Sequence, residues 1–192
     1  MPHLLPSGVL LLGITAMAQA GEVQHARVDH QDGEYSVDIS VKVSGDRDTI
    51  YNIATDYEQL SRLSDLIIES GLTRRVEPDG TRIVRRRLVT RTCVLYFCFD
   101  AVLVEDLWEP ESGLIKTVFI PEESDFLYGE AEWQVLAIDK DHTMINFTSR
   151  FKPSFWVPPL LGPLFIKRMM LGAAQQTIEN IETIAGSEEL RP

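Results

Sequence analysis

The feature that most constrains the fold is a long amphipathic pattern near the C-terminus, over residues 163–185. Apolar residues recur there at spacings of three and four, the period of one face of an α-helix. Pro163 suits the first turn of this helix, and Gly186 suits the position just past its end. The helix would be roughly 35 Å long, so it needs a broad apolar surface to lie on. Its apolar face consists of Ile166, Met170, Ala173, Thr177, Ile181 and Ile184.

The residues before this helix predict a β-sheet as that surface. Residues 35–43 alternate strictly between apolar and polar side chains, which indicates a strand with one buried face. A helical pattern follows at 50–57 and a short helical turn at 60–63, with Asp46 or Asp48 as the cap of the first helix. Turn signals separate the further strands, which we expect at 66–76, 81–92, 98–108, 114–120, 127–138 and 142–152.

This order of elements defines the fold class. Strands grouped together, with helices at either end, indicate an α+β fold with a mainly antiparallel sheet. One face of such a sheet packs on the long helix and the other faces water. The sequence therefore predicts a curved antiparallel β-sheet wrapped around a long C-terminal α-helix, with two short helices after the first strand.

The first twenty residues have the form of an export signal. Residues 9–18 are an apolar run of signal-peptide length, and Ala18-Gln19-Ala20 is a small-x-small cleavage motif. The segment before the run contains no Lys or Arg, and a buried helix is the alternative interpretation. We expect cleavage after Ala20 and a periplasmic or secreted protein. The expected organisation is a signal peptide at 1–20, a flexible lead-in at 21–33, one domain at 34–186 and a tail at 187–192.

The charge balance narrows the choice of partners. The chain carries a formal net charge of −11, which argues against nucleic acid, because a basic face supplies most of the affinity for it. The same charge argues against adsorption to anionic lipid by charge alone. Sequence motifs for nucleotides, zinc proteases or nucleophile elbows are missing. We therefore expect no catalytic residue, no cofactor, no metal and no nucleic acid.

The strand expected at 81–92 is unusual because it carries five arginines, with Ile83, Val84, Leu88 and Val89 as its apolar part. Two interpretations remain open. The arginines form a solvated outer face laced with ion pairs, or they form an anion-binding patch that faces a ligand headgroup. The expected ion-pair partners on later strands are Glu105, Asp106, Glu130 and Glu132.

Cys93 and Cys98 are the two cysteines of the chain and enclose the sequence VLYF. In one straight strand their odd separation would place the thiols on opposite faces of the sheet. In a hairpin with 94–97 as its loop, the two would face each other at its base. An oxidising compartment favours that arrangement, so we predict a disulfide, with two free thiols as the alternative.

Several of these segments together resemble a known family. They are VSGDRDTIYNIATDYEQL at 43–60 with its Asp-Tyr-x-x-Leu corner, the strand around Trp133, the strand at 147–153 and the final helix. The chain resembles the START-like superfamily, also called Bet v 1-like or SRPBCC, and within it the polyketide-cyclase/coenzyme-Q-binding branch. The resemblance covers roughly 34–185. It implies a helix-grip fold with an apolar cavity between sheet and helix, in which members bind lipids, quinones, sterols or polyketides, and some are cyclases.

A cavity is also suggested by the small residues Gly172, Ala173 and Ala174 in the middle of the long helix. Glycine inside a helix costs about 1 kcal/mol relative to alanine, so it needs a reason. Either the helix packs closely on a strand there, or it leaves room for a ligand. Gly129 and Ala131 likewise leave space on the inner face of their strand. The candidate cavity residues are Val84, Leu88, Leu103, Trp133, Phe147, Ile166, Met169, Met170 and Ala173.

Two exposed apolar segments would form a rim if they adjoin. One is the loop between the cysteines and the other precedes the final helix; they contain Leu95, Tyr96, Phe97, Phe155, Trp156 and Leu160. Such a rim would admit a ligand or touch a membrane transiently, and in the alternative the two segments cover one another as core. The function expected is a carrier for a hydrophobic small molecule such as a lipid or quinone. A cyclase/aromatase-type enzyme and an envelope interaction module with a filled cavity remain alternatives.

Overall fold

The computed structural model describes residues 21–76, 82–94, 97–157 and 162–189. The described residues form strands, two α-helices and two short 3-10 helices. In chain order these are β1 (Glu22–Gln31), β2 (Glu34–Ser44), α1 (Arg47–Ala54), η1 (Leu60–Arg62), β3 (Ile67–Val76), β4 (Arg82–Val94), β5 (Phe97–Glu111), β6 (Leu114–Phe119), η2 (Pro121–Glu123), β7 (Phe126–Ala137), β8 (His142–Pro153) and α2 (Gly162–Glu189). The turn expected between the strands at 66–76 and 81–92 lies outside the described residues.

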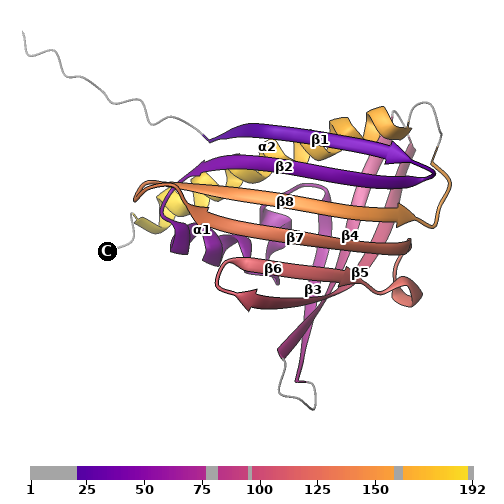
Figure 1. Ribbon diagram of the computed structural model, residues 1–192, viewed down its shortest axis with the longest axis horizontal. Coiled ribbons are helices and arrows are strands. Elements are labelled where there is room, and N and C mark those ends of the chain that lie inside the picture. The colour runs from indigo at the N-terminus through magenta and orange to yellow at the C-terminus, as the bar shows by residue number, and fades with distance from the viewer. Residues whose placement is uncertain (1–20, 77–81, 95–96, 158–161, 190–192) are drawn as a thin grey trace, which may run out of the picture.

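The strands form one antiparallel sheet. Within the described ranges it has eight strands in the order β1-β2-β8-β7-β6-β5-β4-β3. The last strand, β8, lies between β2 and β7, so the two ends of the strand sequence meet inside the sheet. Figure 1 shows β1, β2, β8, β7 and β6 stacked across the view with α2 behind them, while β3, β4 and β5 cross more steeply. The sheet is therefore curved around the long helix, as the α+β prediction requires.

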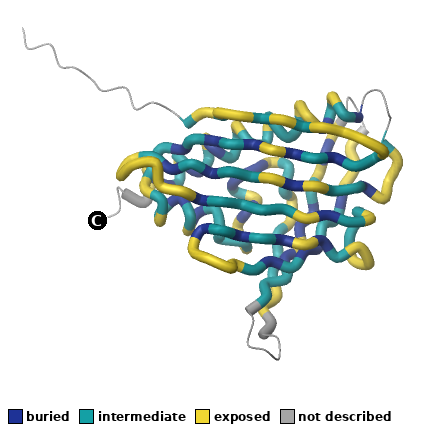
Figure 2. The backbone as a smooth tube through the Cα atoms, in the orientation of Figure 1, coloured by how far each residue is buried: buried dark blue, intermediate teal, exposed yellow. Residues whose placement is uncertain are grey.

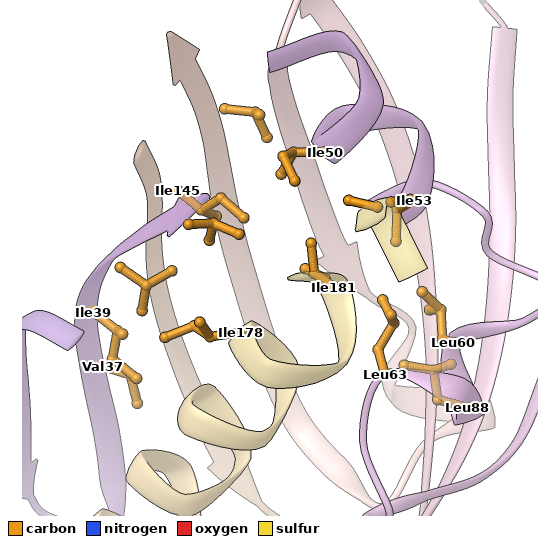
Figure 3. Close-up of a cluster of buried hydrophobic side chains, with 14 residues drawn as sticks. Val37, Ile39, Ile50, Ile53, Leu60, Leu63, Leu88, Ile145, Ile178 and Ile181 are labelled. Atoms are coloured by element: carbon orange, nitrogen blue, oxygen red, sulfur yellow. The ribbon is translucent and has the colours of Figure 1, made fainter. Parts of the chain in front are cut away.

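The core lies between the concave face of the sheet and α2. Along β2 every second side chain is buried, and Figure 2 shows this alternation of buried and less buried residues along the central strands. On α2, Ile178 and Ile181 are each 1% exposed. Figure 3 shows them between strand residues such as Ile39 and Ile145 on one side and Leu63 of the η1 segment on the other. The apolar face of α2 is thus buried against the sheet on one side and against the η1 segment on the other, and this burial stabilises the position of the helix.

The start of α1 follows the prediction. Asp46 is the N-cap, and its carboxylate accepts hydrogen bonds from the backbone N–H groups of Asp48 and Thr49, both at 3.1 Å. A hydrogen bond with the Thr49 side chain, and after it the backbone hydrogen bonds, lower the pKa of the Asp46 carboxyl. The cap places α1 directly after β2, so that Ile50 and Ile53 reach the core.

The expected lead-in at 21–33 was wrong, because most of it is strand β1, paired with β2. Its apolar residues Val23, Ala26 and Val28 pack against the core although they do not alternate strictly. A register shift between Val23 and His25 explains this, since an irregularity moves later side chains to the other face. Because of this irregularity, β1 lacks the strict alternation by which the other strands were predicted.

The expected end of the long helix at Gly186 was also wrong, because α2 continues to Glu189. Ala185 is buried and Ile184 is half-buried against the core, so the turn that holds them stays helical. Gly186 is exposed, with no atom near the position of a Cβ. It therefore carries only the ordinary penalty of a helical glycine, about 1 kcal/mol.

Candidate ligand cavity

A cavity of about 240 Å³ lies between the sheet and α2. Its wall is mostly aliphatic and includes small residues: Ala54 of α1, and Ala173 and Ala174 of α2. The remaining lining side chains come from β2, the segment at 57–64 around η1, the strands β3 to β8 and the middle of α2. The interpretation of the fold as a module with a filled cavity therefore does not fit the structure. Within the described ranges no helix combines the length and hydrophobicity needed to cross a membrane.

Five of the nine candidate cavity residues lie in the cavity wall. They are Leu88, Trp133, Phe147, Met170 and Ala173. Trp133 and Phe147 come from neighbouring strands, and their ring centroids are 4.3 Å apart. These residues share the inner face of the sheet or the stripe of α2, which is why the periodicity could find them. That they contact a ligand stays a prediction.

The other four candidates, Val84, Leu103, Ile166 and Met169, do not line the cavity. Ile166 is buried closer to the start of α2, and Met169 receives a hydrogen bond from the Thr92 hydroxyl at 3.2 Å. On α2 the lining residues begin at Met170. The helical period predicts which face of α2 turns inward, but it does not predict where along that face the cavity lies. Leu103 packs against the core cluster instead.

Gly172, which the sequence analysis connected with close packing or with ligand space, does neither. It is exposed, and no atom lies within 4 Å of the position a Cβ would take. The room in the cavity wall comes from the next two residues, Ala173 and Ala174.

Arg86 is the residue that the sequence analysis misplaced. It points to the inner face of β4, lines the cavity and is 8% exposed, whereas all five arginines had been treated as one surface. Its Nε and Nη2 both donate to Oε1 of Glu105, at 2.9 and 2.5 Å, and Glu105 is 2% exposed. The sequence does indicate an inward position for Arg86, because every second residue of a strand shares a face and Val84 and Leu88 are apolar. Burying a charge is costly, however, and the sequence alone does not reveal that Glu105 lies opposite.

Tyr57 completes this polar part of the wall. The guanidinium carbon of Arg86 lies 5.0 Å from the centroid of the Tyr57 ring, a cation–π distance. Burial raises the pKa of the Tyr57 phenol, and the nearby Arg86 charge partly opposes this. The phenol is therefore neutral at pH 7 and can act as a hydrogen-bond donor. The cavity wall thus combines apolar side chains with a guanidinium and a phenol at one place, and the carboxylate of Glu105 holds the guanidinium from outside the wall.

Three other arginines of β4, Arg85, Arg87 and Arg91, fit the interpretation as an outer face laced with ion pairs. Arg85 pairs with Asp106, Arg87 with Glu69, and Arg91 with Asp100 at 2.7 Å. The Arg91 hydrogen bond also lowers the pKa of the Asp100 carboxyl. Of the four partners expected, Glu105 and Asp106 bind arginines of β4; Glu132 instead pairs with Lys116.

The disulfide between Cys93 and Cys98 is confirmed. The two residues are direct partners across the β4–β5 pair, with their Cα atoms 3.9 Å apart. Just past the bridge, the Phe99 ring lies 5.8 Å from the Phe155 ring. That the segment between the cysteines itself adjoins Phe155 stays a prediction. Trp156 is 78% exposed. Neither Phe155 nor Trp156 lines the cavity; the side chain of Phe97 and residues Leu95, Tyr96 and Leu160 lie outside what the structure describes.

The fold and the cavity define a class: an α+β helix-grip protein with an internal, mainly apolar cavity. In the described part of the chain no three metal-ligating side chains come together. No protein-family model and no curated protein matches the sequence.

Solved structures, in contrast, match over most of the chain. A START superfamily protein from Mycobacterium smegmatis has a TM-score of 0.55 at 19% identity, covering 81% of this chain and 99% of its own. A STAR-related lipid transfer protein from Xanthomonas axonopodis has 0.56 at 11%, with 81% and 98% covered. The Zhui aromatase/cyclase from Streptomyces sp. R1128 has 0.58 at 15%, with 80% and 94% covered. This chain has the START-like (SRPBCC) fold, as its sequence resemblance predicted.

Proposed function

We propose that this protein is an exported carrier that binds a hydrophobic small molecule, such as a lipid or a quinone, in the cavity beneath α2. The observation that carries the proposal is the apolar-lined space of about 240 Å³ next to one buried ion pair. An apolar cavity of roughly 150 Å³ already holds benzene, so this one has room for a substituted ring or a short branched chain. Burial of such a group contributes about 25 cal/mol per Å² of apolar surface.

The ligand in this proposal has one polar group that accepts a hydrogen bond. Glu105 uses Nε and Nη2 of Arg86, which leaves the third nitrogen, Nη1, as the donor for a ligand at the cavity wall. A carbonyl or carboxylate oxygen would suit that donor, with the Tyr57 phenol beside it. An apolar wall with a few placed polar groups is the usual composition of a small-molecule site.

Export is part of the proposal and rests on the leader at 1–20 together with the disulfide. Disulfides persist in oxidising compartments such as the bacterial periplasm. A bridge that closes the β4–β5 hairpin would be stable there.

The test is native mass spectrometry of the protein after gentle extraction from the cell envelope. We expect a co-purified apolar molecule, released by organic solvent and identified by its mass. Thr177→Leu, which narrows the cavity, should lose this mass, whereas Gln175→Leu on the exposed side of the same helix should keep it. Wild-type protein that never carries a ligand, and takes up no added quinone or fatty acid, would contradict the carrier.

A cyclase/aromatase-type enzyme is the second candidate, and the polar side chains of Tyr57 and Arg86 in the cavity wall favour it. A carrier tolerates a purely apolar wall, whereas an enzyme needs a placed acid or base inside its cavity. Incubation with a synthetic linear polyketone distinguishes the two. A mass change that disappears in Arg86→Met would indicate catalysis, and binding without a mass change would indicate the carrier.

The rim formed by Phe155 and Trp156 is proposed as a transient contact with the membrane. Trp156 is the most exposed of the large apolar residues described. Because the net charge of −11 would be repelled by anionic lipid, the membrane in this proposal is zwitterionic. We expect its fluorescence to shift with phosphatidylcholine vesicles. Binding that is unchanged in Trp156→Ser would remove the rim from the proposal.

A further inference from the structure

The first described residue, Gly21, lies in a close-fitting place between β2 and α2. Its backbone N–H donates to Oε1 of Glu182 at 2.7 Å. The same oxygen accepts the backbone N–H of Ser44, also at 2.7 Å. One carboxylate on α2 therefore holds both the start of β1 and the end of β2.

Residue 21 also has no room for a side chain. A Cβ at this position would lie 2.5 Å from the Lys42 carbonyl oxygen, 2.5 Å from Cγ2 of Ile178 and 2.7 Å from Oε1 of Glu182. Such contacts are too short for real atoms, and the Lys42 oxygen belongs to the backbone and cannot swing away. The site fits a glycine and orients its nitrogen toward a carboxylate.

The sequence predicts that the peptide bond just before this nitrogen is the one cut by the leader protease. In that hydrolysis water adds to the carbonyl carbon of Ala20, the C–N bond breaks, and the two products are a carboxylate on Ala20 and an amine on Gly21. At pH 7 the amine takes up a proton and becomes an ammonium group. An amide N–H facing Glu182 is thereby replaced by a full positive charge.

We propose that Glu182 is the binding site for the amino terminus of the processed protein, so that removal of the leader completes the fold. The inference rests on the proposed cleavage after Ala20, but not on any ligand. The Gly21 amide of the unprocessed chain already donates to a carboxylate, and cleavage adds a full positive charge at the same nitrogen, so that the hydrogen bond becomes an ion pair. Glu182 is half-buried and follows Ile178 and Ile181, which line the cavity. The unprocessed chain lacks this ion pair, and we expect it to unfold more readily.

The experiment compares two oxidised proteins that differ by one residue at the start. One begins at Gly21 and the other at Ala20, so both carry a terminal ammonium group, but only the first has it at Glu182. We expect the thermal midpoint of the Gly21 protein to be higher by about 2–4 °C. In Glu182→Gln, which keeps an acceptor oxygen without the charge, that difference should vanish. Equal midpoints, or a difference that survives in Glu182→Gln, would overturn the proposal.

A second variant covers the case in which Glu182→Gln does not fold. Acetylation of the Gly21 amine removes the charge and leaves Glu182 intact, and it should lower the midpoint to that of the Ala20 protein. An unchanged midpoint would again contradict the ion pair. The intact mass of the exported protein tests the cleavage itself: a first residue other than Gly21 would overturn the inference for the natural chain. Ligand binding is read by a separate measurement, so the carrier proposal stands or falls independently.

Discussion

Two regions of the layer between the sheet and α2 are built from different side chains. We call them the aromatic end, near the start of the helix, and the hollow end, beneath its middle. Near the start of the helix, aromatic rings interlock: Phe126 lies 5.4 Å from Phe119, 5.8 Å from Phe151 and 6.2 Å from Phe155. Beneath the middle of α2 the cavity opens, and its wall is mostly aliphatic, with Trp133 and Phe147 as an aromatic pair. The rings near the start of the helix meet edge to face and fill the layer, whereas the small residues Ala54, Ala173 and Ala174 leave space beneath the middle of the helix. The hollow is thus a consequence of which residues lie at each end.

The aromatic end should show the largest loss of stability when it is truncated. Phe119 is 7% exposed, and Phe119→Ala would leave a cavity where its ring meets Phe126. We expect the free energy of unfolding to fall by about 3–5 kcal/mol, measured by urea denaturation. Trp156→Ala, at an exposed aromatic residue, should change it little. Similar values for the two variants would contradict the view that this end is filled by packing.

At the hollow end, the largest effect should come from breaking the buried ion pair. Glu105→Ala leaves the Arg86 charge in the cavity wall without its partner. The expected loss is about 3 kcal/mol in the same urea titration, because an unpaired charge in a mainly apolar site is strongly destabilising. Asp100→Ala, which unpairs the exposed Arg91, is the control and should be nearly neutral. A neutral Glu105→Ala would mean that water reaches the guanidinium freely.

The ion pair of Arg86 and Glu105 shows the limit of what the sequence could predict. The strands and the final helix follow from periods of two and about 3.6, which depend only on local spacing. The ion pair depends on the register between β4 and β5, which sets Arg86 opposite Glu105. Register is decided by turns and by the packing of the whole face, so no local pattern contains it. The disulfide was predicted without the register, because the chain has two cysteines and a hairpin between them brings them together.

Gly129 shows the same limit at the aromatic end. Its missing side chain correctly indicated space on the inner face, but the space is occupied by the ring of Phe119, which contacts the position of the Cβ. That ring comes from β6, and a sequence pattern does not show which neighbour fills a gap. The hollow at Ala173 carries a similar signal and stays open. Space left by one residue therefore predicts a cavity only when every neighbour is known.

Gly129→Ala sharpens this point with an intermediate effect. The new methyl group would collide with Phe119, so we expect a loss of about 1–3 kcal/mol in the free energy of unfolding. Gly172→Ala is the matched control, since it meets no atom and removes a flexible residue from the helix. That variant should be more stable by about 0.5–1 kcal/mol. If both variants shift the free energy of unfolding in the same direction, the two glycines do not differ in the space around them as described.

The smallest effect on stability should come from filling the hollow itself, and it decides most about function. Ala173→Leu extends a side chain into open space, so we expect a gain of about 0.5–1 kcal/mol, as cavity filling usually gives. Ala101→Leu enlarges a buried alanine outside the cavity wall and should instead cost about 1–3 kcal/mol through overpacking. Ala173→Leu should also lower ligand uptake at least tenfold, a difference of about 1.4 kcal/mol in binding. A stabilised Ala173→Leu that still takes up the wild-type ligand in full would place the ligand elsewhere, and the contrast between a filled and a hollow end would then describe packing alone.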